Sequence, residues 1–216
     1  MARPRRPLLT RERIIATALA LVDAEGLAAV STRRLATELG VQGPSLYNHV
    51  RTKDDLIDAM VDAVLGEVDI SMFDEISAGN PDWRSALRAW SRSYRTAMAA
   101  HPRIVPALAS GPGQRPNALR MADAVFGGLV AAGWPRREAT TVGTLMRYFL
   151  TGASLGSFAG GFPSDAAVYT DAYPHLNEAH LLADRQQRID RDAFEVGLES
   201  LLDGLDSRYR LLRGGV

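Results

Sequence analysis

Apolar residues recur at helical spacing along most of the chain. After Thr10, which can cap a helix, Ile14, Ala18 and Val22 follow the 3.6-residue period, and Gly26 can end that helix. No segment shows the alternating pattern of a strand, so we expect an all-α protein of nine or ten helices. Further helical segments are expected at 33–39, 44–50, 52–68, 83–100, 122–130, 142–150 and 194–205.

The second and third of these segments are short and are separated by a turn bounded by glycines. The first of the two ends at Gly40, and the next begins at Gly43-Pro44, where a proline is favoured because its missing N–H would be unpaired in any case. This spacing predicts a helix-turn-helix. The outward residues of its second helix are of types that can contact base edges and phosphates, and its glycine allows close backbone approach. They are Gln42, Gly43, Ser45, Tyr47, Asn48 and His49.

Charge is distributed unevenly, although the formal net charge is zero. Residues 1–53 hold nine basic and four acidic residues, whereas the rest holds 16 basic and 21 acidic residues. A basic N-terminal part favours a polyanionic partner. The single lysine, Lys53, lacks the glycine pattern of a phosphate-binding loop, which excludes that nucleotide site.

Several classes of protein are excluded by what the composition lacks. The absence of cysteine rules out disulfides, thiolate metal sites and cysteine nucleophiles. No apolar run reaches the ~20 residues of a membrane span, and no apolar stretch follows the basic N-terminus as in a signal peptide. We therefore expect a cytoplasmic protein that has no membrane partner.

The segment from Thr10 to about Leu65 resembles the DNA-binding domain of the TetR (tetracycline repressor) family. The resemblance implies that Tyr47 and Lys53 hold DNA phosphates and that Arg33 can read a base. It rests on Gly26-Leu27, Ser31-Thr32-Arg33-Arg34-Leu35-Ala36, Leu39-Gly40-Val41 and the run from Ser45-Leu46-Tyr47-Asn48-His49-Val50 to Arg51-Thr52-Lys53-Asp54-Asp55-Leu56. The complete set of expected DNA contacts is Thr32, Arg33, Gln42, Gly43, Pro44, Ser45, Tyr47, Asn48, His49 and Lys53.

The second half of the chain is similar to the regulatory domain of the tetracycline repressor. This similarity implies a helix-turn-helix domain at 1–55 and a helical effector-binding and dimerisation domain at 56–216, of which 160–190 is irregular. It is carried by Trp83-Arg84, Tyr94-Arg95, His101-Pro102, Ala132-Gly133-Trp134 and Tyr148-Phe149-Leu150-Thr151-Gly152.

One departure from that repressor concerns its magnesium–drug chelate, which is held by histidine and acidic side chains. Asp69 and Leu108 stand where the repressor has histidine, and Gly156 stands where it has glutamate. We therefore expect no cofactor, no metal ion and no chelated tetracycline as the ligand.

A small-molecule effector is the second partner that the resemblance implies. The family counterparts of Trp90, Tyr94, Met121, Val125 and Arg147 line the effector cavity, and we expect a moderately hydrophobic effector. Arg147 is a cation within an apolar stripe and therefore needs a partner. That partner is either an internal carboxylate or an acidic or carbonyl-bearing ligand.

Two late helices carry apolar stripes that are too wide for the surface of a monomer. The resemblance implies that these helices form a four-helix interface between two subunits, and the alternative is packing within one chain. A homodimer also suits helix-turn-helix proteins, which gain affinity from two half-sites about 34–36 Å apart. The expected interface residues are Leu145, Phe149, Gly197, Leu198, Leu201 and Leu205.

A serine esterase is the alternative that the sequence offers from another class. Gly152, Ser154 and Gly156 form the pattern of a hydrolase nucleophile elbow, and Asp171 and His175 follow in the required order. That elbow needs a preceding strand and a parallel sheet, whereas the upstream residues keep the helical period. We therefore expect no enzyme and no catalytic residue.

The sequence also contains groups that could form a metal site or bind an acidic protein. His175, Glu178 and His180 contain metal-binding groups, but a spacing of five places the two histidines on different faces of a helix. A basic N-terminal part could also bind an acidic protein, which would leave the helix-turn-helix unexplained. We predict a homodimeric, ligand-responsive transcription regulator, a repressor that binds a double-stranded DNA operator and is released from it by its effector.

Overall fold

The computed structural model describes residues 9–109, 114–169 and 173–214, and these residues form helices and turns without any strand. The all-α prediction is confirmed. The α-helices are α1 (Arg11–Glu25), α2 (Thr32–Leu39), α3 (Gly43–Tyr47), α4 (Lys53–Leu65), α5 (Met72–Ser77), α6 (Trp83–Ala100), α7 (Pro116–Ala131), α8 (Arg136–Ser154) and α9 (Gln186–Gly214). Short 3-10 turns are η1 (Leu27–Ala29), η2 (Val105–Ala109), η3 (Ala159–Gly161), η4 (Ala166–Tyr169), η5 (Ala179–Leu181) and η6 (Ala183–Arg185).

The N-terminal helices begin where the sequence predicts, but α3 ends at Tyr47 instead of Val50 and α4 ends at Leu65 instead of about Val68. The side chains of Thr10, Ser31 and Thr52 each accept a hydrogen bond from the backbone N–H three residues further on. Such a cap stabilises a helix by about 1 kcal/mol, because it satisfies an N–H that has no partner within the helix. Gly40 ends α2 in the left-handed conformation, with φ at +65°, which a side chain would strain.

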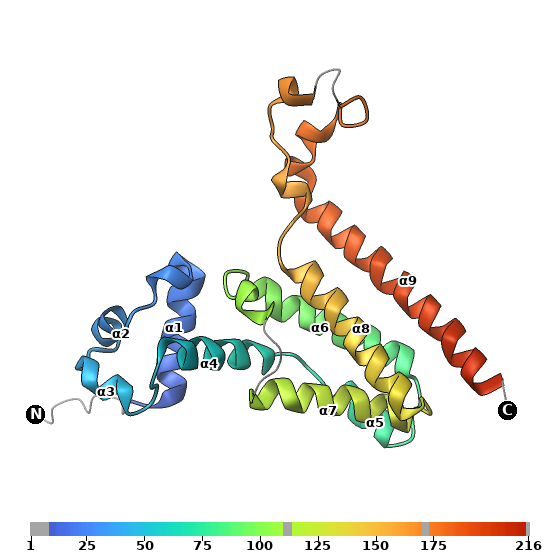
Figure 1. The fold of residues 1–216 in the computed structure, drawn as a ribbon, viewed down its shortest axis with the longest axis horizontal. Helices are drawn as coiled ribbons and strands as arrows, with labels where there is room; N and C mark the ends of the chain where they lie inside the picture. The colour runs from blue at the N-terminus through green and yellow to red at the C-terminus, as the bar shows by residue number, and fades with distance from the viewer. Residues whose placement is uncertain (1–8, 110–113, 170–172, 215–216) are drawn as a thin grey trace, which may run out of the picture.

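Three parts can be followed along the chain in Figure 1. Helices α1, α2 and α3 form a small group at one end, and α4 runs from this group to a body built from α5, α6, α7 and α8. Helix α9 packs against α6. The described part of the expected irregular segment 160–190 holds only short 3-10 turns before α9 begins at Gln186, and it extends beyond the body.

Helix α5 is the one α-helix of the described residues that the hydrophobic pattern does not predict. It has only six residues, and Phe73 and Ile76 anchor it in the core. The Phe73 ring lies against Trp90 with its centroid 6.1 Å away. Gly128 on α7 allows this close packing, because a Cβ at that position would lie 2.7 Å from the Phe73 ring.

An aromatic cluster fixes the far end of α9 against the body. Trp83 and Trp134 meet edge to face, with ring centroids 5.2 Å apart, and the Tyr209 ring packs against both. The Tyr209 hydroxyl donates a 2.7 Å hydrogen bond to the carbonyl of Ala132. The cluster therefore joins α9 to α6 and to the turn between α7 and α8.

A row of ion pairs runs beside this cluster, between α6 and α9. Arg88 donates two hydrogen bonds to the Glu199 carboxylate, at 2.6 and 2.8 Å, and these bonds lower the pKa of Glu199 from its usual 4.5 to about 2. The charged residues recur once per helical turn on both helices, and this shared spacing sets the register of α6 against α9. The pairs join Arg84, Arg88 and Arg92 of α6 to Glu195, Glu199 and Asp203 of α9.

We expect Glu199→Gln to lower the free energy of unfolding at neutral pH by about 1 kcal/mol or less, because solvent screens a partly exposed pair. The pKa of Glu199 is lowered in the folded protein, so its contribution is complete above pH 4.5 and is lost as the pH falls towards 2. Urea unfolding at several pH values and one protein concentration measures the difference from wild type. The control is Asp206→Asn, which removes an ion pair with Arg210 inside α9. If the free energies of unfolding of wild type and Glu199→Gln differ by a constant amount below pH 4, this account is wrong.

Candidate DNA-binding surface and effector pocket

A small apolar core holds α2 against α3. Leu35, Leu39, Leu46 and Val50 are buried, and Ala36 joins them at the edge of the core. Val41, in the turn between the two helices, is partly buried against this core. The short helix α3 follows a turn and has Pro44 in its first turn, as the sequence predicts.

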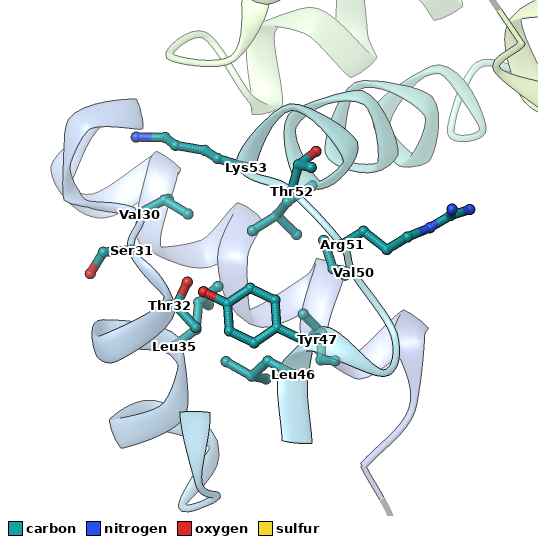
Figure 2. A pocket seen from close by; sticks show the side chains of 12 residues that line it. Val30, Ser31, Thr32, Leu35, Leu46, Tyr47, Val50, Arg51, Thr52 and Lys53 are labelled. Atoms are coloured by element: carbon teal, nitrogen blue, oxygen red, sulfur yellow. The ribbon is translucent and has the colours of Figure 1, made fainter. Parts of the chain in front are cut away.

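The outer face of this unit is hollowed between the start of α2 and the turn from α3 to α4 (Figure 2). The hollow has a volume of about 400 Å³. The Tyr47 ring lies over it, above Leu46, with its hydroxyl beside that of Thr32, and 56% of Tyr47 is exposed. Lys53 and Arg51 extend away from the ring in different directions. An exposed phenol flanked by two cations can contact a phosphate backbone.

Of the expected DNA contacts, Thr32, Tyr47 and Lys53 line this hollow, and the others lie on or beside α2 and α3. Arg33 forms no ion pair among the described residues, whereas its neighbour Arg34 is held by Glu25 at 2.9 Å and Glu38 at 3.1 Å. Of these two arginines, Arg33 is therefore the one whose guanidinium is not held by a carboxylate of the described residues. Arg33, Gln42, Pro44, Tyr47, Asn48 and Lys53 are exposed, and Thr32, Gly43, Ser45 and His49 are partly buried.

A second cavity, of about 610 Å³, lies among α6, α7, α8 and η2. Trp90, Met121, Val125 and Arg147, which were expected to line an effector site, all line it. Tyr94 does not line this cavity and packs instead beneath the guanidinium of Arg147. The remaining lining residues are Leu108, Ala118, Ala122, Phe126, Gly143, Thr144, Tyr148, Thr151, Gly152 and Leu155. Half of these, namely Ala118, Gly143, Thr144, Thr151 and Leu155, lie at helical spacing from Met121 or Arg147, and this spacing is the signal that could have found them.

One glycine shapes the wall of this cavity. A Cβ at Gly143 would lie only 2.3 Å from the Phe126 ring, so the absence of a side chain lets that ring approach α8 closely. Phe126 is therefore held where it lines the cavity.

Arg147 supplies the cationic group of the cavity. Its Nη1 atom is buried and has no hydrogen-bond partner among the described residues. The guanidinium carbon lies 4.9 Å from the centre of the Tyr94 ring. Burial lowers the pKa of this arginine, and the nearby charge of Arg115 lowers it further. The internal carboxylate that could have paired with Arg147 is absent from the described part of the chain.

The residues of the cavity do not fit a chelated magnesium ion. The lining, as far as the structure describes it, contains no imidazole and no carboxylate, and it contains a cation that would repel a metal. Leu108 contributes an apolar side chain, and the Asp69 carboxylate accepts a hydrogen bond from the Ser71 N–H at 2.9 Å. No cluster of three metal-binding side chains occurs among the described residues, those near His175 and His180 included.

The hydrolase pattern lies in the last turn of α8 and beyond it. The Ser154 hydroxyl donates a 2.7 Å hydrogen bond to the carbonyl of Leu150, one turn earlier in the same helix. The described residues contain no strand that could form a nucleophile elbow, and Asp171 lies outside them. Nothing in this arrangement supports the esterase alternative.

The residues expected at a dimer interface divide into two groups. Leu198 and Leu205 are buried within the chain, so packing inside the subunit accounts for them. Leu145 is 39% exposed, and Phe149 and Leu201 are partly buried. Gly197 brings α9 close to α8, because a Cβ there would lie 2.9 Å from the Phe149 ring. The outward parts of these helices also carry Tyr148 and Val196, which are 72% and 68% exposed.

Comparisons with known proteins agree on the class of protein that this fold defines. The family model for bacterial regulatory proteins of the tetR family matches residues 14–60, and the tetracyclin repressor-like C-terminal domain matches residues 77–209. The class A tetracycline repressor of Escherichia coli, from transposon 1721, is 34% identical over 206 residues, which cover 93% of this chain and 92% of that protein. An HTH-type transcriptional regulator of Saccharopolyspora erythraea is 34% identical over 171 residues, covering 79% of this chain and 70% of that protein.

Solved structures agree with these matches. The Streptomyces coelicolor TetR family protein ActR, in complex with actinorhodin, superposes with a TM-score of 0.70 at 30% identity, covering 93% of this chain and 98% of that one. The fold and the exposed helix-turn-helix define a DNA-binding transcription regulator. The chain belongs to the TetR family, whose members are ligand-responsive regulators that bind operator DNA. In the described part of the chain, no helix is both long and apolar enough to cross a membrane.

We expect Lys53→Ala to weaken binding to any duplex by a similar factor, because a phosphate contact carries no sequence information. The slope of log affinity against log salt should fall by about one. The measurement is fluorescence anisotropy on a duplex of arbitrary sequence across a range of sodium chloride concentrations. Arg120→Ala, which removes an exposed arginine on α7, is the matched control. An unchanged slope for the Lys53 variant would remove this residue from the phosphate contacts.

Proposed function

We propose that this protein is a repressor that binds a palindromic operator as a homodimer and leaves it when a small, moderately hydrophobic effector occupies the cavity lined by Arg147. The observation that carries the proposal is that helix α4 joins the two sites. An exposed polar and cationic surface on α2 and α3 lies at one end of α4, and the wall of a 610 Å³ cavity is attached to the same helix. Because its operator is DNA, we place the protein in the cytoplasm.

Helix α4 is bound to the start of α7 by polar contacts. The Asp62 carboxylate accepts hydrogen bonds from the backbone N–H groups of Asn117, at 2.8 Å, and Ala118, at 3.2 Å. Arg115, just before α7, donates to the Asp58 carboxylate at 3.1 Å. Asp62 thereby provides hydrogen-bond acceptors for the first turn of a helix that lines the cavity. An effector that displaces α7 would therefore also displace α4 and the DNA-binding surface.

The energetic requirement for this response is small. An effector that prefers the released arrangement by ~1–3 kcal/mol changes operator occupancy several-fold or more. Relatives support the assignment of the two partners. ActR has been solved with actinorhodin bound, and several relatives are named as tetracycline repressors.

Selection from a randomised duplex pool tests the DNA-binding part of the proposal. Purified protein at near-physiological salt should enrich a palindrome whose halves lie about one helical turn apart or slightly more, because a two-fold dimer presents two reading surfaces. Arg33→Ala should relax the preference at one position in each half. A pool that stays random with folded, dimeric protein would mean that the helix-turn-helix reads no sequence.

A separate prediction concerns the dimer. We expect Leu145→Glu to yield monomers, since the residue is 39% exposed in the single chain and a charge on an apolar interface is costly to bury. Analytical ultracentrifugation measures the association, and circular dichroism verifies that the helices remain. Thr141→Glu, one turn earlier on an exposed position of α8, provides the comparison. If the Leu145 variant remains dimeric, the interface lies on another face.

A further inference from the structure

The cavity lined by Arg147 has an unusual electrostatic composition for an apolar site. Its walls are mainly aliphatic and aromatic, and its one charged lining residue, among those the structure describes, is Arg147. An arginine side chain keeps its positive charge and offers only hydrogen-bond donors. The cavity therefore presents a fixed cation without a fixed anion.

The contacts of Arg147 leave this charge uncompensated. Among the residues that the structure describes, its buried Nη1 atom has no hydrogen-bond partner, and its one attractive contact is with the face of the Tyr94 ring, 4.9 Å from the guanidinium carbon. A cation–π contact is worth about 0.5–2 kcal/mol and supplies no hydrogen-bond acceptor in the plane of the guanidinium. Arg115, the other charge that acts on this group, is a cation as well.

Two neighbours of this site carry further buried donors: Trp90, which lines the same cavity, and Tyr94, which packs against Arg147. The Trp90 Nε1 atom and the Tyr94 hydroxyl are each buried without a hydrogen-bond partner among the described residues. An indole nitrogen can only donate, so this group, like the guanidinium, can be satisfied only by an acceptor. Buried polar groups in native proteins nearly always have partners, which makes this concentration of unpaired donors informative.

The size and access of the cavity limit what the acceptor can be. A volume of about 610 Å³ lies within the ~300–1,000 Å³ range of sites for drug-sized ligands. Tyr148 and Leu155, which line it, are 72% and 53% exposed, so the cavity opens to solvent beside them. A largely apolar molecule with a single anionic end is complementary to a cavity that has an apolar wall and one cation.

We infer that the effector is an organic anion, a largely apolar molecule whose carboxylate, phenolate or enolate oxygen accepts hydrogen bonds from the Arg147 guanidinium. This inference rests on the proposed function, since it names the chemical class of the ligand for the same cavity. The Tyr94 ring packs against the guanidinium through its face, and among the described residues no group accepts a hydrogen bond from the Nη1 atom. Arg147 is thus the residue that discriminates an acid from a neutral molecule of equal shape.

Three pairs of fluorescent probes test this discrimination. They are 2-naphthoate, 9-anthracenecarboxylate and 1-pyrenebutyrate, each compared with its neutral carboxamide by anisotropy titration of the full-length protein above pH 7. A hydrogen-bonded pair of charges should favour at least one acid over its amide by about tenfold or more. Equal or tighter binding of the amides overturns the inference.

Variants assign the preference to one side chain. Arg147→Met should abolish the preference for the acid and leave the amide affinity within about twofold. Arg147→Lys keeps the charge and should retain part of the preference. Arg137→Met, on an exposed position of the same helix, should behave as wild type. A preference that persists in Arg147→Met would place the anion elsewhere, and the wild-type comparison stands even if a variant fails to fold.

The outcomes separate this inference from the proposed function. Amides that bind while acids do not would retain the cavity as an effector site and reject an anionic effector. If no probe binds, both the anionic ligand and the assignment of the cavity are rejected, whereas the enrichment of an operator from the duplex pool remains an independent result.

Discussion

The two halves of this protein depend on one helix that is shared by both of their cores. Met60, Val61 and Val64 of α4 have no exposed surface, because α1 covers the helix on the DNA-binding side and α6 and α7 cover it in the body. The carboxylates of Asp58 and Asp62 then attach the same helix to the beginning of α7. Helix α4 therefore cannot move independently of either half, and a displacement of the cavity wall must either strain these contacts or reposition α2 and α3.

Periodicity and capping residues predict most of the helices, because these signals are local. Thr10, Ser31 and Thr52 cap their helices as expected, whereas α5 is too short to establish a period and is held by its packing. A buried face is also predictable from the sequence, but the surface that covers it is not. Leu198 illustrates this limit, because its apolar stripe suits either a subunit interface or packing within one chain, and the structure buries this leucine inside the chain.

The candidate sites show the same division between local and tertiary information. The exposed residues of the helix-turn-helix follow from a compact motif of about twenty residues, so they could be located from the sequence and the family resemblance together. The cavity is assembled from four elements, so the sequence indicates an arginine in an apolar stripe but cannot say what surrounds it. The structure supplies that information: no carboxylate faces Arg147 among the described residues, and Tyr94, at helical spacing from Trp90, lies behind the cavity wall.

The contact between Gly143 and the Phe126 ring bears on how this cavity can evolve. The glycine determines how far the ring reaches into the cavity, whereas the charge of the cavity comes from a residue one turn further along α8. The shape and the charge of the cavity are therefore determined by different residues. A descendant could change the shape of the site by substitutions at 126 or 143 and keep the charge that Arg147 supplies, without any change to the residues of α2 and α3.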